Sequence, residues 1–200
     1  MKTVIFDMHG VIMKDPSAKF MPFINRTFPH KTEDDVYPMW IEAGFGRLTS
    51  LECLRMIGYE GDLNKIERDY LDTLEIDEDF VPCATALRRN CRLAILSNDI
   101  SDWSLYIRRK YNLDELFDAI VISGDVGLKK PSRDIYRLML EKLGQPGDEC
   151  VFIDDRLVNL PPAEALGIET VLFDRGAFAY EGYGGKRIAG FDDLREMLGY

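Results

Sequence analysis

Five short and almost continuously apolar runs constrain the fold of this chain more than any other feature. They read TVIFD, RLAILS, AIVIS, CVFIDD and ETVLFD, at residues 3–7, 92–97, 119–123, 150–155 and 169–174. Strands with one solvated face alternate apolar and polar residues, whereas strands buried on both faces do not. The runs therefore predict parallel strands with helices on both sides.

Amphipathic stretches separate the later runs, at residues 102–112, 132–144 and 160–167. The last two end in Gly144 and Gly167, which suit the position after a helix C-terminus. Strands that alternate with helices indicate an α/β doubly wound, Rossmann-like parallel sheet. The active site of such a sheet lies beyond the carboxyl ends of its strands.

Two segments depart from this alternation. Residues 15–83 contain only helical patterns, so we expect a core of 1–14 and 84–200 with a small helical cap insert that folds over the strand ends. Residues 174–190 are rich in glycine and aromatic residues and are interpreted as a loop, with Asp174 as a turn or surface residue. A final helix is expected from Asp192, as its N-cap, to Leu198.

Charge and composition exclude several classes of partner. The net charge of -10 argues against nucleic acid, because a phosphate backbone needs a basic face. No stretch approaches the roughly 20 apolar residues of a membrane span, and the N-terminus lacks the pattern of a signal peptide. The four cysteines are not spaced as a zinc or redox motif, which favours buried thiols in a cytoplasmic protein.

Polar residues gather where three of the predicted strands end. They are Asp7, Ser97 with Asn98, and Asp154 with Asp155. The carboxyl ends of parallel strands meet at one edge of a sheet, so three carboxylates would share one crevice and repel each other. A bound Mg²⁺, which prefers oxygen ligands, would relieve this repulsion.

The same crevice has groups suited to a phosphate. The Ser97 hydroxyl, the Asn98 amide and nearby backbone N–H groups would form a phosphate cradle. Lys130, in the stretch GLKKPSRDIY, supplies a cation for phosphoryl oxygens. Together these residues indicate phosphoryl chemistry, although each alone also suits a turn, a cap or a surface position.

Four motifs in this order resemble those of the haloacid dehalogenase (HAD) superfamily of hydrolases. They are Asp7-Met8-His9-Gly10-Val11, Ser97-Asn98, Gly127 with Lys130-Pro131, and Asp154-Asp155 with Asn159 and the later Ala163 and Gly167. The resemblance runs from residue 3 to about residue 174. The insert after the first motif is similar to the cap of one subclass.

The resemblance implies a role for each residue. Asp7 would be the nucleophile that forms an aspartyl-phosphate. Asp7, Asp155 and the backbone carbonyl of His9 would hold Mg²⁺, with Asp154 as a further ligand or as an acceptor behind the ligands. Ser97 and Asn98 would bind the phosphoryl group, and Lys130 would hold nucleophile and phosphate together.

The chain departs from the family at His9, where phosphatases of the family carry an acid/base Asp. Three interpretations remain open: His9 takes over this role, the intermediate hydrolyses slowly, or the chemistry differs. The family's 2-haloacid dehalogenases also lack that Asp, but they usually lack the acidic pair present here. A phosphate-binding module that has lost catalysis is a further alternative.

The choice of substrate depends on residues of the cap, which contains none of the four motifs. Tyr37, Trp40, Phe45 and Arg47 are candidate contacts, and Arg47 would reach an anionic or sugar group. The prediction is a Mg²⁺-dependent phosphatase of a small phosphorylated metabolite, with a sugar phosphate suggested by analogy alone.

Overall fold

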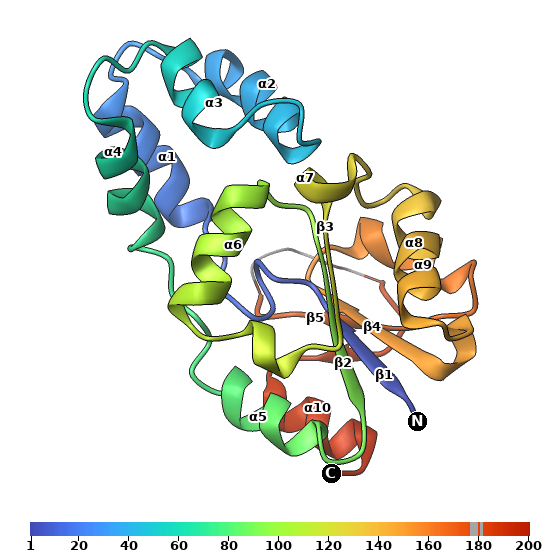
Figure 1. The fold of residues 1–200 in the computed structure, drawn as a ribbon. Helices are drawn as coiled ribbons and strands as arrows, with labels where there is room; N and C mark the ends of the chain where they lie inside the picture. The colour runs from blue at the N-terminus through green and yellow to red at the C-terminus, as the bar shows by residue number, and fades with distance from the viewer. Residues whose placement is uncertain (177–179, 181) are drawn as a thin grey trace.

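The computed structural model describes residues 1–176, 180 and 182–200, and its centre is a parallel six-stranded sheet (Figure 1). The spatial order of the strands is β3-β2-β1-β4-β5-β6. The strands are β1 (Thr3–Phe6), β2 (Arg92–Ser97), β3 (Ala119–Ile122), β4 (Cys150–Asp154), β5 (Glu169–Phe173) and β6 (Arg187–Ile188). The predicted α/β doubly wound sheet is confirmed, and the first five strands follow the five apolar runs.

Helices connect these strands and form the insert. They are α1 (Ser17–Thr27), α2 (Glu33–Gly44), α3 (Ser50–Ile57), α4 (Leu63–Leu71), α5 (Phe80–Leu87), α6 (Ser101–Lys110), α7 (Ser123–Val126), α8 (Arg133–Leu143), α9 (Leu160–Glu164) and α10 (Phe191–Leu198). Gly144 caps α8 in the left-handed conformation, as its sequence position predicted. Helices α6, α8 and α9 match the three predicted amphipathic stretches within a few residues.

The absence of alternation in the apolar runs reflects two separate cores. In β1, Val4 and Phe6 face one core, which includes residues of α5, α6 and α10. Ile5 faces the other core, which α8 and α9 cover. All three side chains are fully buried. Figure 1 shows α5 and α10 on one side of the sheet and α8 and α9 on the other.

The strand order places the first strand at the point where the chain reverses direction across the sheet. Strand β1 pairs with β2 on one side and with β4 on the other, both in parallel. In doubly wound sheets a crevice forms beyond the carboxyl end of the strands at this point. Asp7 follows β1 directly and therefore lies at that crevice.

The tail differs from its prediction in two places. Arg187 and Ile188, which were expected in a loop, form β6 beside β5; two residues are too few to show a strand period. The last helix begins at Phe191 rather than after an N-cap at Asp192. Asp193 accepts hydrogen bonds from the N–H groups of Ala189 and Gly190, so its side chain provides partners for the backbone N–H groups at the start of this helix. The predicted loop residues 177–179 and 181 lie outside the described part of the chain.

Helices α1 to α4 form the insert. The segment through which the chain enters the insert and the segment through which it returns to the core are hydrogen-bonded to each other. The N–H of Lys14 donates to the carbonyl of Glu75 at 2.9 Å, and that of Asp77 to the carbonyl of Ile12 at 2.9 Å. The predicted boundary at 83/84 falls inside α5, which packs on the core rather than with the insert. Figure 1 shows α5 beside α10, far from α1 to α4.

The insert touches the core at the carboxyl edge of the sheet. Gly46 follows α2 with a φ of +70°, and a Cβ there would lie 2.0 Å from the carbonyl oxygen of Gly124. Gly44 meets the Nζ of Lys129, which would lie 3.1 Å from an added Cβ. Two glycines therefore allow the insert to approach the strand ends closely.

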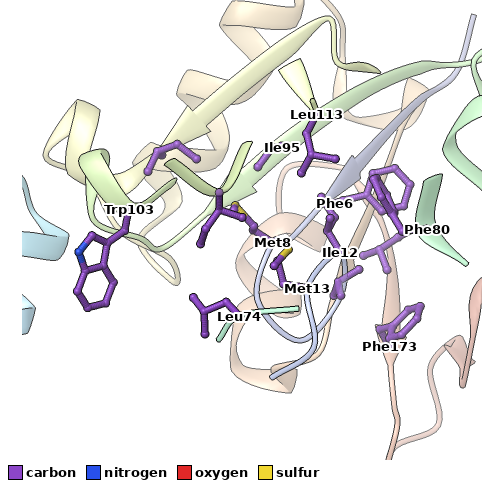
Figure 2. Close-up of a cluster of buried hydrophobic side chains, with 14 of the residues drawn as sticks. Phe6, Met8, Ile12, Met13, Leu74, Phe80, Ile95, Trp103, Leu113 and Phe173 are labelled. Carbon is purple, nitrogen blue, oxygen red and sulfur yellow. The ribbon is translucent and has the colours of Figure 1, made fainter. Parts of the chain in front are cut away.

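The larger core extends from the insert along the face of the sheet that α5 and α10 cover. Figure 2 shows its side chains extending from Trp103 through Met8 and Met13 to Phe80. All four cysteines are buried free thiols. Across residues 1–176, 180 and 182–200, no helix has both the length and the apolar character that crossing a bilayer requires.

A substitution at Phe80 tests whether α5 belongs to this core. Its ring lies 5.5 Å from that of Phe6 and 5.4 Å from that of Phe191, and the side chain is fully buried. We expect Phe80→Ala to lower the free energy of unfolding by about 3–5 kcal/mol, because a large cavity remains. Val81, which is 39% exposed, is the neighbouring control, and Val81→Ala should change it by less than about 1 kcal/mol. Equal effects in urea denaturation would contradict this placement of α5.

Candidate active site

Asp7 is held in one orientation at the end of β1. Its own N–H donates to the carbonyl of Ile153 on β4 at 2.9 Å, which continues the sheet pairing by one residue. Its Oδ1 accepts the N–H of Met8 at 2.6 Å and lies 2.9 Å from the Nζ of Lys130. The carboxylate is buried. A buried carboxylate fixed by a cation and a backbone N–H is suited to act as a nucleophile.

Lys130 lies between two carboxylates with no exposed side-chain surface. Its Nζ is 2.9 Å from Asp7 and 2.7 Å from Asp154. Burial alone would lower the pKa of Lys130, but the charges of Asp154 and Asp7 and their hydrogen bonds raise it above its usual value. The ammonium therefore stays charged between the two carboxylates.

Asp154 uses its oxygens for contacts within the protein. Its Oδ1 accepts the N–H of Arg156 at 2.7 Å, and its Oδ2 accepts Lys130 at 2.7 Å. The amide of Asn159 donates to both oxygens, at 2.9 and 3.0 Å. This pattern favours the second predicted role for Asp154, as an acceptor that positions Lys130, over direct metal ligation.

Asp155 completes an acidic cluster. One carboxylate oxygen from each of Asp7, Asp154 and Asp155 lies within 4.8 Å of the others. Burial, followed by the charges of Asp7 and Asp154, raises the pKa of Asp155 to about 7. Gly10 has a φ of +86°, and a Cβ there would lie 2.3 Å from the Oδ2 of Asp155, so only glycine leaves room for this carboxylate.

The cluster fits a magnesium ion by its chemistry. All of its donors are oxygens, and three carboxylates close together are unfavourable without a cation. Asp7 and Asp155 are better placed than Asp154 to bind a metal ion. Both oxygens of Asp154 accept hydrogen bonds, whereas only Oδ1 of Asp7 does so among the described residues. A divalent cation beside them would hold the Asp155 carboxyl in its charged form.

Ser97 is the last residue of β2, next to β1, and Asn98 follows it, but only one of the two side chains is free of hydrogen bonds within the described part of the protein. The hydroxyl of Ser97 is buried and has no hydrogen-bond partner among the described residues. The Asn98 side chain instead holds the backbone of Lys130: its Nδ2 donates to the Lys130 carbonyl at 2.9 Å and its Oδ1 accepts the Lys130 N–H at 2.8 Å. Ser97 thus keeps a hydroxyl without a partner among the described residues, while Asn98 holds the backbone of Lys130.

His9 forms a pair with Asp99, a residue that the sequence reasoning did not select. The Nε2 of His9 lies 3.0 Å from the Oδ2 of Asp99, and the Nδ1 is buried without a partner in the described chain. Burial alone would lower the pKa of His9, but Asp99 and then Asp7 and Asp155 raise it above its usual value. The position of Asp99, directly after Ser97-Asn98 at a strand end, was the signal that would have identified it.

Arg47 lies away from these residues. Its guanidinium is exposed, pairs with Glu42 at 3.1 Å and covers the ring of Phe45. It is not among the residues that line the cavity beside His9, so its contact with substrate stays a prediction.

A cavity of about 280 Å³ lies between the insert and the strand ends. It is lined by residues of both parts: His9, Asp15, Pro16, Ser17, Phe20, Tyr37, Trp40, Ile41, Gly44, Tyr70, Leu74, Asn98, Asp99, Ile100, Trp103 and Lys129. Tyr37 and Trp40, two of the predicted cap contacts, are on its wall. The cavity reaches the core at His9, two residues after Asp7, and at Asn98, one residue after Ser97.

Several relatives match most of this chain, among them two from Aspergillus species. Drimenol cyclase drtB from Aspergillus calidoustus is 25% identical over 183 residues, which are 87% of this chain and 34% of the relative. Sesquiterpene phosphatase astK from Aspergillus oryzae is 22% identical over 183 residues, or 84% of this chain and 87% of the relative. The chain thus spans about a third of drtB and a quarter of the next relative, a bifunctional epoxide hydrolase 2 of Rattus norvegicus.

The fold and the family agree with the predicted resemblance. A HAD family enzyme from Bacteroides thetaiotaomicron, solved with magnesium and inorganic phosphate, superimposes with a TM-score of 0.76 at 21% identity, covering 90% of this chain and 98% of that one. Residues 1–167 match the haloacid dehalogenase-like hydrolases. The chain belongs to this hydrolase family.

Proposed function

We propose that the protein is a magnesium-dependent phosphatase that cleaves small phosphate monoesters through an aspartyl-phosphate on Asp7. The observation that carries the proposal is the buried Lys130 ammonium, 2.9 Å from Asp7 and 2.7 Å from Asp154, beside the carboxylate of Asp155. The phosphatase and the magnesium–phosphate complex among its relatives support it.

The first half of the reaction uses Asp7, Lys130 and Ser97. A carboxylate oxygen of Asp7 attacks phosphorus, and the bond between phosphorus and the alcohol oxygen breaks. Lys130 and the free hydroxyl of Ser97 stabilise the charge on the phosphoryl oxygens. The departing alkoxide takes a proton and leaves as the alcohol.

The second half regenerates the enzyme. Water loses a proton to a base and attacks phosphorus, the bond to Asp7 breaks, and inorganic phosphate is released with the carboxylate restored. Asp7, Asp155 and the backbone carbonyl of His9 would hold Mg²⁺, with Asp154 behind them. The ion would supply charge neutralisation for a phosphate approaching three carboxylates.

We assign the proton transfers to His9. It lies between the cavity and the acidic cluster, whose Asp7 and Asp155 charges act on it. The protonated imidazole is the form that donates to a leaving group, and the neutral form is the one that accepts a proton from water. The ring faces Asp99 in this structure, so the transfer requires it to turn toward the phosphate.

A second candidate is a family member that binds phosphate but turns over slowly. The observation that favours it is the occlusion of both His9 nitrogens, one by Asp99 and one by burial. A 2-haloacid dehalogenase is the remaining alternative, and the acidic pair of Asp154 and Asp155 disfavours it. An assay with haloacids alongside phosphate esters separates these functions.

Removing the nucleophile tests the proposed chemistry. We expect wild-type protein with Mg²⁺ to hydrolyse p-nitrophenyl phosphate, and Asp7→Asn to lower kcat by at least about 10³-fold, since the amide is a poor nucleophile. EDTA should lower the rate comparably and added Mg²⁺ should restore it. The exposed Asp34 is a matched control, and Asp34→Asn should leave the rate within about twofold. Hydrolysis that persists in Asp7→Asn, or that is unchanged by EDTA, would show that the proposed chemistry is wrong.

The role of His9 has a separate test. His9→Ala should lower kcat by about 10²–10⁴-fold, the usual contribution of a positioned acid/base group. His9→Asp, which restores the residue found in the family's phosphatases, should recover at least part of the loss. Turnover of His9→Ala equal to that of wild type would exclude an acid/base role for the imidazole. Circular dichroism of each variant verifies that the fold is unchanged.

A further inference from the structure

We infer that the cavity between the insert and the strand ends holds the alcohol part of the substrate and selects an apolar, ring-bearing alcohol over a polyol such as a sugar. The inference rests on the proposed phosphatase function and gives its substrate class. It replaces the sugar phosphate suggested by analogy.

Aromatic rings form most of one side of the cavity. Phe20, Trp40, Trp103 and Tyr70 contact one another in series, with ring centroids 5.2 Å apart for Phe20 and Trp40, 5.6 Å for the two tryptophans, and 5.0 Å for Tyr70 and Trp103. Rings packed against each other in this way form a continuous apolar surface with little freedom to adapt. Such a surface fits a flat or cyclic hydrocarbon group.

Aliphatic side chains extend this surface. Ile41, Leu74 and Ile100 also line the cavity. Ile41 is only half-buried and is not part of either hydrophobic core, whereas its neighbour Trp40 packs against one. Burying apolar ligand surface against these groups would favour binding by about 25 cal/mol per Å².

Several polar groups on the wall already have partners in the protein, whereas the Nε1 of Trp40 is a single buried donor without one among the described residues. Asp15 accepts the N–H and hydroxyl of Ser17 at 2.9 and 2.8 Å. His9 is paired with Asp99, whose Oδ1 also accepts a backbone N–H. Asn98 holds the Lys130 backbone through both ends of its amide, as described above. A sugar needs a partner for each hydroxyl that it buries, and these groups already hold contacts within the protein.

Lys129 is the cation on the wall that lacks a carboxylate. Its ammonium is half-buried, lies 5.6 Å from the centroid of the Phe45 ring, and has no ion-pair partner within 4 Å in the described part of the chain. One cation suits the charge of the phosphate or a single acceptor on the alcohol. It cannot satisfy the several hydroxyls of a sugar.

The test compares benzyl phosphate with glycerol phosphate, both esters of primary alcohols. The Asp7→Asn protein with Mg²⁺ is titrated with each ester while tryptophan fluorescence is followed, because both tryptophans of the chain line the cavity. Calorimetry gives an independent dissociation constant. We expect benzyl phosphate to bind at least about tenfold more tightly, and its kcat/KM with wild-type protein to be at least about tenfold higher.

A substitution in the cavity wall tests whether this cavity causes the preference for benzyl phosphate. Ile41→Asn should weaken benzyl phosphate binding by about fivefold or more and change glycerol phosphate binding by less than about twofold. Met56→Asn makes the same kind of change at an exposed position of the insert and should affect neither ester. Equal losses for both esters in Ile41→Asn would overturn the assignment.

The outcomes separate this inference from the proposed function. If wild-type protein hydrolyses both esters with equal kcat/KM, the phosphatase function stands and the inference is overturned. If the Asp7→Asn protein prefers benzyl phosphate but wild-type protein hydrolyses neither ester, the cavity assignment stands and the catalytic proposal fails. If neither ester is bound or hydrolysed, both are overturned.

Discussion

The buried ammonium of Lys130 is the group on which the candidate site depends. Its side chain has no exposed surface, so its charge must be balanced by Asp7 and Asp154. Asn98, directly after β2, holds the backbone of Lys130 by hydrogen bonds. Asp7 comes directly after β1, and Asp154 is the last residue of β4. Three neighbouring strand ends are thus joined through one residue. Removal of a single partner from such a pair leaves a buried charge, which costs about 3–5 kcal/mol. The contacts that orient Asp7 for attack are therefore also contacts that the fold requires.

Most of the core and of the acidic cluster could be predicted from the sequence because local patterns determine them. Strands buried on both faces leave an apolar run with no period, and five such runs gave five of the six strands. The carboxyl ends of parallel strands lie at one edge, so Asp7, Ser97 and Asp154 had to come close together. Lys130 could be proposed for the same crevice from its motif, although its complete burial could not.

The features that the sequence did not reveal depend on contacts distant along the chain. Helix α5 looks like a continuation of the insert, and only the packing of Phe80 against Phe6 and Phe191 shows that it belongs to the core. Asp99 follows a predicted strand end, but nothing local indicates that it pairs with His9, ninety positions earlier. The cavity wall likewise combines α1 and α2 with α6, and their rings meet only once the insert lies over the sheet.

The pair of His9 and Asp99 changes how the departure at position 9 is understood. A histidine in place of the family's Asp removes one negative charge beside Asp7 and Asp155 and, when protonated, adds a positive one. Asp99 lies 3.0 Å from the imidazole, so a protonated His9 and the Asp99 carboxylate offset each other's charge. With His9 protonated, an ion pair rather than a fourth unpaired carboxylate lies between the acidic cluster and the cavity. Less repulsion then acts on the phosphate of an entering substrate, while the carboxylates that attract a divalent cation remain those of Asp7, Asp154 and Asp155.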